Sequence, residues 1–326
     1  MAVTSADVAR ASGVSRTTVS YVLNGRPGTA ISEATRRRVL EAAEQLGYAP
    51  SAAARALRRG RSDLVLVVLP HWPIGPVIDT LLDHLADDLA ERDMSVLVHH
   101  DRGTRPLADL WRVVTPHTVV GLTSFAPQDV QSMRRAGIRV VSSRTGADHA
   151  GVLSYTGAQR RIGQMQVEHL VARGRHRVGW AGPTDRRLTV FAEPRLAGVA
   201  EACERAGLRA PVVADVELEV ASARSAATTW RDAGVDAVAA YNDDVALSVL
   251  AGLRAEGVAV PADVAVIGVD DTPAARLACP ALSTISQSIE LQADYLAAAT
   301  LAALDGEDGR LPWPPDVLTV VGRDST

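Results

Sequence analysis

Five residues of hydrogen-bonding type fall within one short stretch of the chain and can present donors and acceptors to base edges. They are Arg16, Thr17, Ser20, Tyr21 and Asn24. Arginine, amide and hydroxyl side chains form the pairs by which proteins distinguish bases in the DNA major groove. All five point away from the apolar positions Val19, Val22 and Leu23, which recur at intervals of three and four along a predicted helix. The chemistry indicated is contact with double-stranded DNA.

Two capped helices joined by a glycine turn must position these side chains. Thr4 can cap the first helix, with Asp7 completing a capping box, and Ser15 can cap the second. Gly13 supplies the turn, since a residue without Cβ adopts positive φ freely. The first helix has an apolar face made of Val8, Ala9 and Ala11. A helical hairpin in any small bundle shows the same pattern, so it does not establish DNA binding by itself.

The distribution of charge favours the DNA-binding interpretation. Residues 1–62 hold ten arginines and four acidic residues, a net charge of +6, whereas the rest of the chain carries −10. A basic head on an acidic body is expected when only the head meets phosphate. The alternative is a solvated surface with chance asymmetry. All 34 basic residues are arginine, which indicates biased codon usage and carries no functional conclusion.

A third helix and a basic alanine-rich segment follow. The third helix is predicted to begin at Ser32 and end near Gly47. Its inward face is predicted to comprise Val39, Ala42, Ala43 and Leu46. The next segment, 51–62, favours helix but is too short to be stable alone. Leu57 is its one bulky apolar residue, which fits a wedge inserted into the minor groove; a flexible linker is the alternative.

From Leu64 onward, β-branched runs alternate with amphipathic helices, which predicts two doubly wound parallel-sheet subdomains in succession. Residues 159–171 are expected to form the helix that crosses between them. Helices near 193–206, 221–233, 243–256 and 287–304 are expected to fill the second subdomain. Ligands of such sheets bind outside the carboxyl ends of the strands, here in the cleft between subdomains.

Other classes of protein fit less well. The pairs Asp243–Asp244 and Asp270–Asp271 raise the possibility of carboxylate chemistry, but no phosphate loop, nucleophile elbow or metal-ligand spacing accompanies them. No catalytic residue, metal or cofactor is therefore expected. A solute-binding protein for transport predicts an export signal, and none is evident, so the cytoplasm is the expected compartment. Cys203 and Cys279 are expected to be buried thiols.

Two strings in the head and three in the body carry a family resemblance. They are TSADVARASGVSRTTVSYVLN, LGYAPSAAARAL, NDDVALSVLAGLRAEGVAVPADVAVIGVDD, PALSTISQS and VVGRDST. In that order they resemble the LacI/GalR (lactose-repressor) family of bacterial transcription regulators. The resemblance implies a helix-turn-helix head similar to the lambda repressor over 1–50 and a hinge helix over 51–61. It also implies a periplasmic-binding-protein-like body over 62–326 that binds effector and dimerises.

The resemblance also implies roles for individual residues. It assigns operator contacts to Thr4, Ser15, Arg16, Thr17, Ser20, Tyr21 and Asn24, with Ala54 and Leu57 in the minor groove. It assigns effector contacts to Arg195, Asn242, Asp270 and Gln287, and the loop after the first strand adds His71 and Trp72. Trp72 either stacks on a ligand ring or packs over the cleft. A homodimeric repressor of a palindromic operator is expected, and no C-terminal leucine heptad indicates a tetramer.

The first subdomain departs from the family pattern where an effector is held. Ser143, Tyr155 and Thr156 replace residues usual at the fourth strand and the crossing helix, and Val220 stands where a stacking aromatic is expected. An ordinary hexose effector is therefore in question. Another small polar molecule, or a body that dimerises without binding an effector, remains open.

Overall fold

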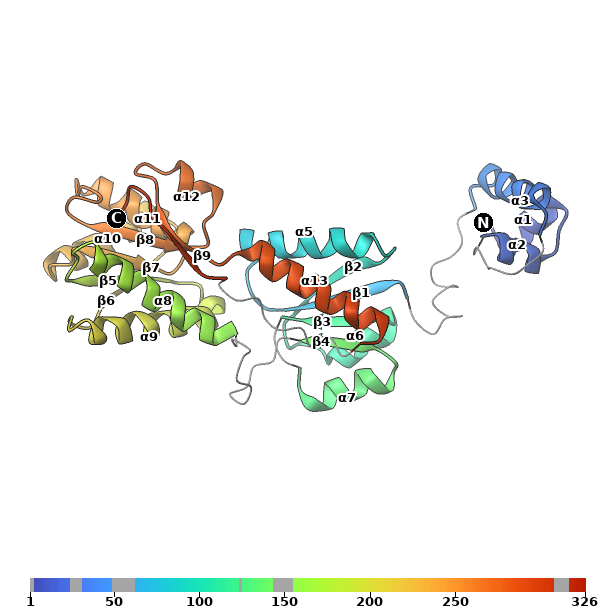
Figure 1. The fold of residues 1–326 in the computed structure, drawn as a ribbon, viewed down its shortest axis with the longest axis horizontal. Helices are drawn as coiled ribbons and strands as arrows, with labels where there is room; N and C mark the ends of the chain where they lie inside the picture. Colours follow the sequence, from blue (N-terminus) through green and yellow to red (C-terminus); the bar gives the residue numbers. More distant parts are fainter. Residues whose placement is uncertain (1–2, 24–30, 49–61, 123–124, 143–154, 308–316) are drawn as a thin grey trace. The chain divides into compact units, whose positions relative to one another are not determined.

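The computed structural model describes residues 3–23, 31–48, 62–122, 125–142, 155–307 and 317–326 (Figure 1). The chain divides into two compact units, Met1–Asp63 and Leu64–Thr326. None of the helices in the described ranges is long and apolar enough to cross a membrane.

Three helices pack around a small apolar core in the first unit. Val8, Val19 and Val39, one from each helix, are fully buried and form its centre. The inward face of the first helix differs from the expectation: Ala11 is exposed and Ser12 is buried. Ser12 is accommodated because its hydroxyl donates to the carbonyl of Val8, 2.6 Å away. The helices are α1 (Ser5–Ser12), α2 (Arg16–Leu23) and α3 (Glu33–Gln45).

The expected caps and turn define the hairpin of α1 and α2. The Asp7 carboxylate accepts hydrogen bonds from the backbone N–H and the hydroxyl of Thr4, at 3.0 and 2.7 Å. The Ser15 hydroxyl accepts from the backbone N–H of Thr18 at 3.1 Å. Gly13, between the helices, has a φ of +68°, a conformation that favours glycine. At the other end of the core, Leu46 was expected to be inward but is 36% exposed.

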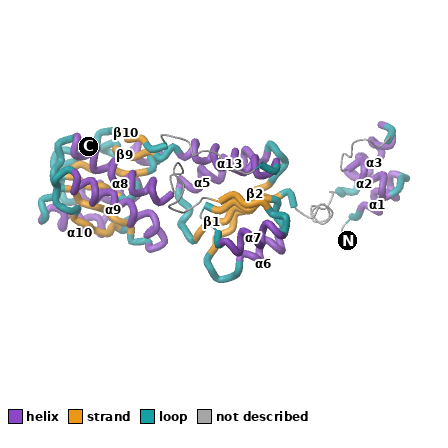
Figure 2. Tube along the Cα trace, turned by 60° about the horizontal axis from the view of Figure 1, so that its bottom comes forward, coloured by secondary structure: helices purple, strands orange, loops and turns teal. Residues whose placement is uncertain are grey.

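A four-stranded parallel sheet in the order β2-β1-β3-β4 forms the first subdomain of the second unit. Helices cover both faces, as Figure 2 shows. Alternate residues of β1 point to opposite faces, so Val65 and Val67 join the core under α5 and α13, whereas Leu66 and Val68 meet α6 and α7. The elements are β1 (Leu64–Pro70), α5 (Pro76–Ala90), β2 (Ser95–Asp101), α6 (Leu107–Val114), β3 (Thr118–Gly121), α7 (Pro127–Arg135) and β4 (Arg139–Ser142).

A six-stranded sheet in the order β10-β9-β8-β7-β5-β6 forms the second subdomain, with β10 antiparallel to β9 and the other pairings parallel. Helices α8 and α9 contact its strands β5, β7 and β8, and α10 and α11 pack together against β5 to β8. The strands are β5 (Val178–Pro183), β6 (Val212–Val216), β7 (Ala237–Ala240), β8 (Ala265–Val269), β9 (Ser283–Ser286) and β10 (Thr319–Val321). The helices are α8 (Tyr155–Ala172), α9 (Thr189–Arg205), α10 (Val220–Asp232), α11 (Asp243–Ala255), α12 (Pro273–Leu277) and η1 (Arg186–Leu188).

One helix lies in a different subdomain from the one expected. Helix α13 (Ile289–Asp305) packs against α5, β3 and β4 of the first sheet, not against the second (Figure 1). Its small residues Ala297 and Ala303 enter the core that contains Leu85 and Leu89 of α5. The subdomains therefore do not simply succeed one another, because the chain returns to the first through α13. Helical periodicity identifies α13 but not the sheet that it covers.

Candidate functional site

Helix α2 presents the candidate DNA-reading side chains. Arg16 and Thr17 are exposed, whereas Ser20 and Tyr21 are partly buried. Thr4 and Ser15 are exposed at the helix starts, and their hydroxyls already make the hydrogen bonds described above. The remaining candidates, Asn24, Ala54 and Leu57, lie outside the described residues.

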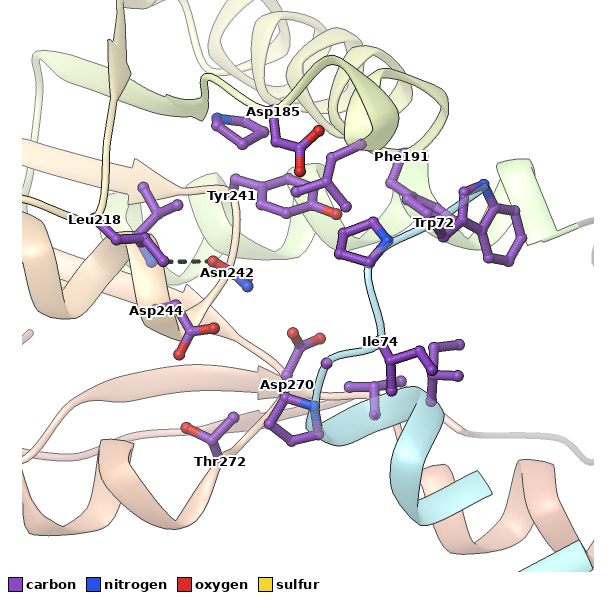
Figure 3. Close-up of a pocket in the computed structure, with 18 of the residues that line it drawn as sticks. Trp72, Ile74, Asp185, Phe191, Leu218, Tyr241, Asn242, Asp244, Asp270 and Thr272 are labelled. Carbon is purple, nitrogen blue, oxygen red and sulfur yellow. Dashed lines mark hydrogen bonds between the residues drawn. The ribbon is translucent and has the colours of Figure 1, made fainter. Parts of the chain in front are cut away.

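A cavity of about 280 Å³ lies in the second unit, outside the carboxyl ends of the strands of the second sheet (Figure 3). This is the edge at which ligands of parallel α/β sheets bind. It is lined by the loop after β1, the loops after β5 to β8, and side chains of α9. Trp72, Arg195, Asn242, Asp270 and Gln287 are among the lining residues, so five of the six predicted effector contacts come together. The sixth, His71, is exposed and is not a lining residue.

A strained turn directs the Asp270 carboxylate into the cavity. Asp270 and Asp271 follow β8 with φ angles of +108° and +53°, in the region that non-glycine residues rarely occupy. Three contacts hold this turn in place. The backbone N–H of Asp270 donates to the carbonyl of Ile285 at 2.8 Å, and the Asp271 carboxylate forms ion pairs with Arg323 and Arg276. These contacts stabilise the strained backbone of the turn, which would otherwise relax to a more favourable conformation.

Burial perturbs two carboxyl groups at this edge of the sheet. Burial raises the pKa of Asp270 to about 6, against the opposing effects of the nearby Arg195 charge and a 2.6 Å hydrogen bond from the Gln287 amide. Burial also raises the pKa of Asp243 to about 7, although this carboxylate accepts from the Thr284 hydroxyl and the Thr272 backbone N–H. Asp243 is fully buried and is not a lining residue, so its role is within the fold.

Arg195 is the only basic residue among the described side chains that line the cavity. It projects from α9, is 4% exposed, and lies over the ring of Tyr241 with its guanidinium carbon 4.7 Å from the centroid. Its Nε donates to the Gln159 side-chain oxygen and its Nη1 to the Tyr241 carbonyl, each at 2.5 Å. Two of the guanidinium nitrogens thus already donate hydrogen bonds within the protein, and these bonds fix the orientation of the side chain.

The two amides of the site are also partly committed. The Asn242 side-chain oxygen caps α11 by accepting from the backbone N–H of Val245 at 3.0 Å. Gln287 donates to Asp270, as noted above. Each amide therefore orients a neighbouring element and has only part of its hydrogen-bonding capacity left for a ligand.

Sequence reasoning placed Trp72 at the cavity but missed the other residues of its apolar side and one carboxylate. Trp72 and Phe191 lie together in Figure 3, and Ile74, from the same loop as Trp72, also lines the cavity; these three residues are called the apolar wall below. The rings of Trp72 and Phe191 meet edge to face, with centroids 4.6 Å apart. Asp244, in the first turn of α11, also lines the cavity. The signal for Asp244 was present, because it follows Asn242 at the end of a strand, but its neighbour Asp243 has the same sequence context and is buried.

Other expectations resolve less completely. Val220, at the start of α10, is 49% exposed and does not line the cavity, whereas Leu218 does. Ser143 lies outside the described residues. Cys203 is buried as expected, but Cys279 is exposed, because it lies in the loop between α12 and β9.

Comparison with known proteins extends these observations to the whole chain. Residues 4–51 match the family described as bacterial regulatory proteins, lacI family, and residues 167–326 match the periplasmic binding protein-like domain. The HTH-type transcriptional regulator GntR of Pseudomonas aeruginosa is 30% identical over 93% of this chain and 90% of its own. The chain belongs to the LacI family. This LacI-family chain is a transcriptional regulator with a helix-turn-helix head and an α/β body.

Two solved structures resemble this LacI-family regulator over nearly its full length. A transcriptional regulator CelR–cellobiose complex is 28% identical, with a TM-score of 0.62, and the match covers 99% of this chain and 100% of that one. A lac repressor dimer bound to operator and the anti-inducer ONPF is 22% identical, with a TM-score of 0.77, covering 100% and 99%. At 22% identity, the similarity to the lac repressor dimer shows only that the two folds are alike.

Proposed function

We propose that this regulator is a repressor that binds a palindromic operator as a homodimer and is controlled by a small effector in the cavity. The observation that carries the proposal is the cavity itself, which collects five residues distant in sequence at the ligand-binding edge of the sheet. A body that only dimerises has no need of a strained turn aiming a carboxylate into such a space. The relative CelR, solved with cellobiose, supports a small-molecule effector.

In the head, we assign base reading to α2. Exposed Arg16 and Thr17, with Ser20 and Tyr21 beside them, carry the donors and acceptors needed in a major groove. Arg38, exposed on α3, is assigned a phosphate contact. On the resemblance alone, Asn24 is assigned to the same groove and Ala54 and Leu57 to the minor groove at the operator centre. A protein with these targets works in the cytoplasm, where bacterial DNA lies.

Two matched arginine substitutions test the DNA assignment. Operators selected from random DNA by the full chain provide the substrate. R16A is expected to relax the preferred base at one half-site position and to cost about 1–3 kcal/mol on the selected operator. R38A is expected to weaken binding to all sequences alike and to reduce the salt dependence by about one phosphate contact. Equal losses on selected and random DNA for R16A contradict base reading by α2.

Thermal melting against sugars, nucleosides, amines and small acids tests control by an effector. A specific ligand raises the melting temperature of the native chain in proportion to the logarithm of its concentration. The same compound is expected to change operator affinity. Operator binding that persists while no compound shifts the melt contradicts effector control and leaves DNA binding intact.

A further inference from the structure

The charged groups of the cavity do not balance. Its described lining contains three carboxylates, Asp185, Asp244 and Asp270, and one guanidinium, Arg195. The Asp185 carboxylate is neutralised locally, because Arg187 donates to both of its oxygens at 2.5 to 3.0 Å. Arg195 offsets one further negative charge. One carboxylate is left over.

Asp244 is the carboxylate without compensation. Among the described residues, its side chain makes no hydrogen bond or ion pair, and it is only partly buried at the cavity surface. Burial is the main cause of the raised pKa of Asp270, and repulsion from the negative charge of Asp244 raises that pKa further. Asp270 has one oxygen bonded to Gln287 and therefore retains acceptor capacity. Both carboxylates reach the same space from the ends of neighbouring strands (Figure 3).

The apolar wall of Trp72, Ile74 and Phe191 bounds another side of this space. Hydroxyls pressed against it would lose their hydrogen bonds to water without replacement, which costs free energy for each buried group. A molecule hydroxylated on every side therefore fits poorly. The cavity volume of about 280 Å³ is at the small end for ligand pockets. The cavity therefore fits only a small molecule.

We propose that the effector is an organic monocation, with a protonated amine between Asp244 and Asp270 and an apolar body against Trp72, Ile74 and Phe191. This inference rests on the proposed control by an effector and specifies its chemical class. The amine supplies the missing positive charge and donors to both carboxylates, as charge-assisted hydrogen bonds require. Anionic ligands are excluded by the same two carboxylates, since a like charge in a partly desolvated site is disfavoured.

Three compounds of matched shape test the charge requirement on the full chain. Phenethylamine, phenethyl alcohol and 3-phenylpropanoate differ chiefly in carrying a positive, zero or negative charge. The amine is expected to bind at least tenfold more tightly than the alcohol in calorimetry or thermal melting, and the acid is expected not to bind. Equal binding of amine and alcohol, or tighter binding of the acid, overturns the proposal.

Variants locate the effect. D244N is expected to reduce amine affinity about tenfold while leaving alcohol affinity unchanged, and D232N, an exposed carboxylate outside the cavity at the end of α10, is expected to change neither. I74S, at a side chain that is already 51% exposed, is expected to weaken the binding of amine and alcohol equally. An amine affinity that D244N leaves unchanged overturns the assignment.

A neutral-sugar panel separates this proposal from the function on which it rests. If glucose or cellobiose raises the melting temperature and changes operator affinity while the amine does neither, control by an effector stands and the cationic class of effector is wrong. If no sugar, nucleoside, amine or small acid has any effect while operator binding persists, both the cationic class and effector control are wrong.

Discussion

At the scale of single residues, neighbouring aspartates serve different purposes because their surroundings differ. Asp243 and Asp244 are consecutive in the first turn of α11, where the helix dipole favours negative charge. The Asp243 side chain turns into the protein and meets the hydroxyl of Thr284 and the backbone of Thr272. Asp244 turns toward the cavity. One has its pKa raised by burial, and the other is available to a ligand.

The buried Asp243 predicts a pH dependence of stability. Its folded pKa of about 7 lies above the ordinary aspartate value of 3.8, so between these two pH values the folded chain holds a proton that the unfolded chain has lost. The free energy of unfolding therefore falls as the pH rises from about 4 through 7. D243N removes this loss, since an amide can accept from the Thr272 N–H and donate to the Thr284 hydroxyl.

The measurement is the melting temperature of both proteins at pH 5 and pH 8. D243N is expected to lose less stability over this range and to exceed the parent at pH 8 by about 3 °C or more. Asp270, whose pKa is about 6, accounts for the remaining slope. Parallel pH profiles for the two proteins would show that Asp243 does not titrate in this range.

At the scale of elements, two helices approach closely enough to exclude side chains. Gly163 of α8 and Gly198 of α9 face each other's helices, and a Cβ on either would lie 2.0 Å from a backbone carbonyl oxygen. For Gly163 that oxygen belongs to Arg195. The close approach thus fixes the position of α9, from which Arg195 reaches Gln159 and Tyr241.

G198A is expected to force α8 and α9 apart. Overpacking of this kind costs about 1–3 kcal/mol, which corresponds to a melting temperature lower by about 3–10 °C. The displacement of Arg195 is expected to weaken effector binding as well. G322A is the matched control, because the nearest atom to its Cβ is the flexible end of Arg173 at 3.4 Å. Unchanged melting for G198A would refute the close packing.

At the scale of the whole molecule, the proposed function requires that a ligand in the body and an operator at the head influence each other. Such coupling is a single free energy, so it is reciprocal. If an effector changes operator affinity by some factor, the operator must change effector affinity by the same factor.

This reciprocity is open to direct measurement. Operator affinity is measured with and without saturating effector, and effector affinity with and without saturating operator, at one salt concentration. The two factors are expected to agree within error, with values of about 5 to 150 for typical allosteric proteins. Disagreement would mean that the compound acts on DNA binding without occupying the cavity in a linked equilibrium.

Much of this molecule was predictable from local pattern. Caps, the turn at Gly13 and the periods of α2 and β1 depend on residues a few positions apart, so the sequence alone predicts them. The alternation of strands and helices also predicts a cleft at the carboxyl edge of the strands, and the family resemblance, not local pattern, assigned Arg195, Asn242, Asp270 and Gln287 to it; all four line the cavity found there.

Only the tertiary structure decided the rest, because burial depends on contacts between distant segments. It assigned α13 to the first sheet, left His71 outside the cavity, and separated Asp243 from Asp244. It also brought Trp72 and Phe191 into contact from positions more than a hundred residues apart. The sequence by itself determined that a basic helix-turn-helix head precedes an α/β body, because caps, turns and periods are local; the charge and apolar shape of the cavity arise from packing that local pattern does not contain.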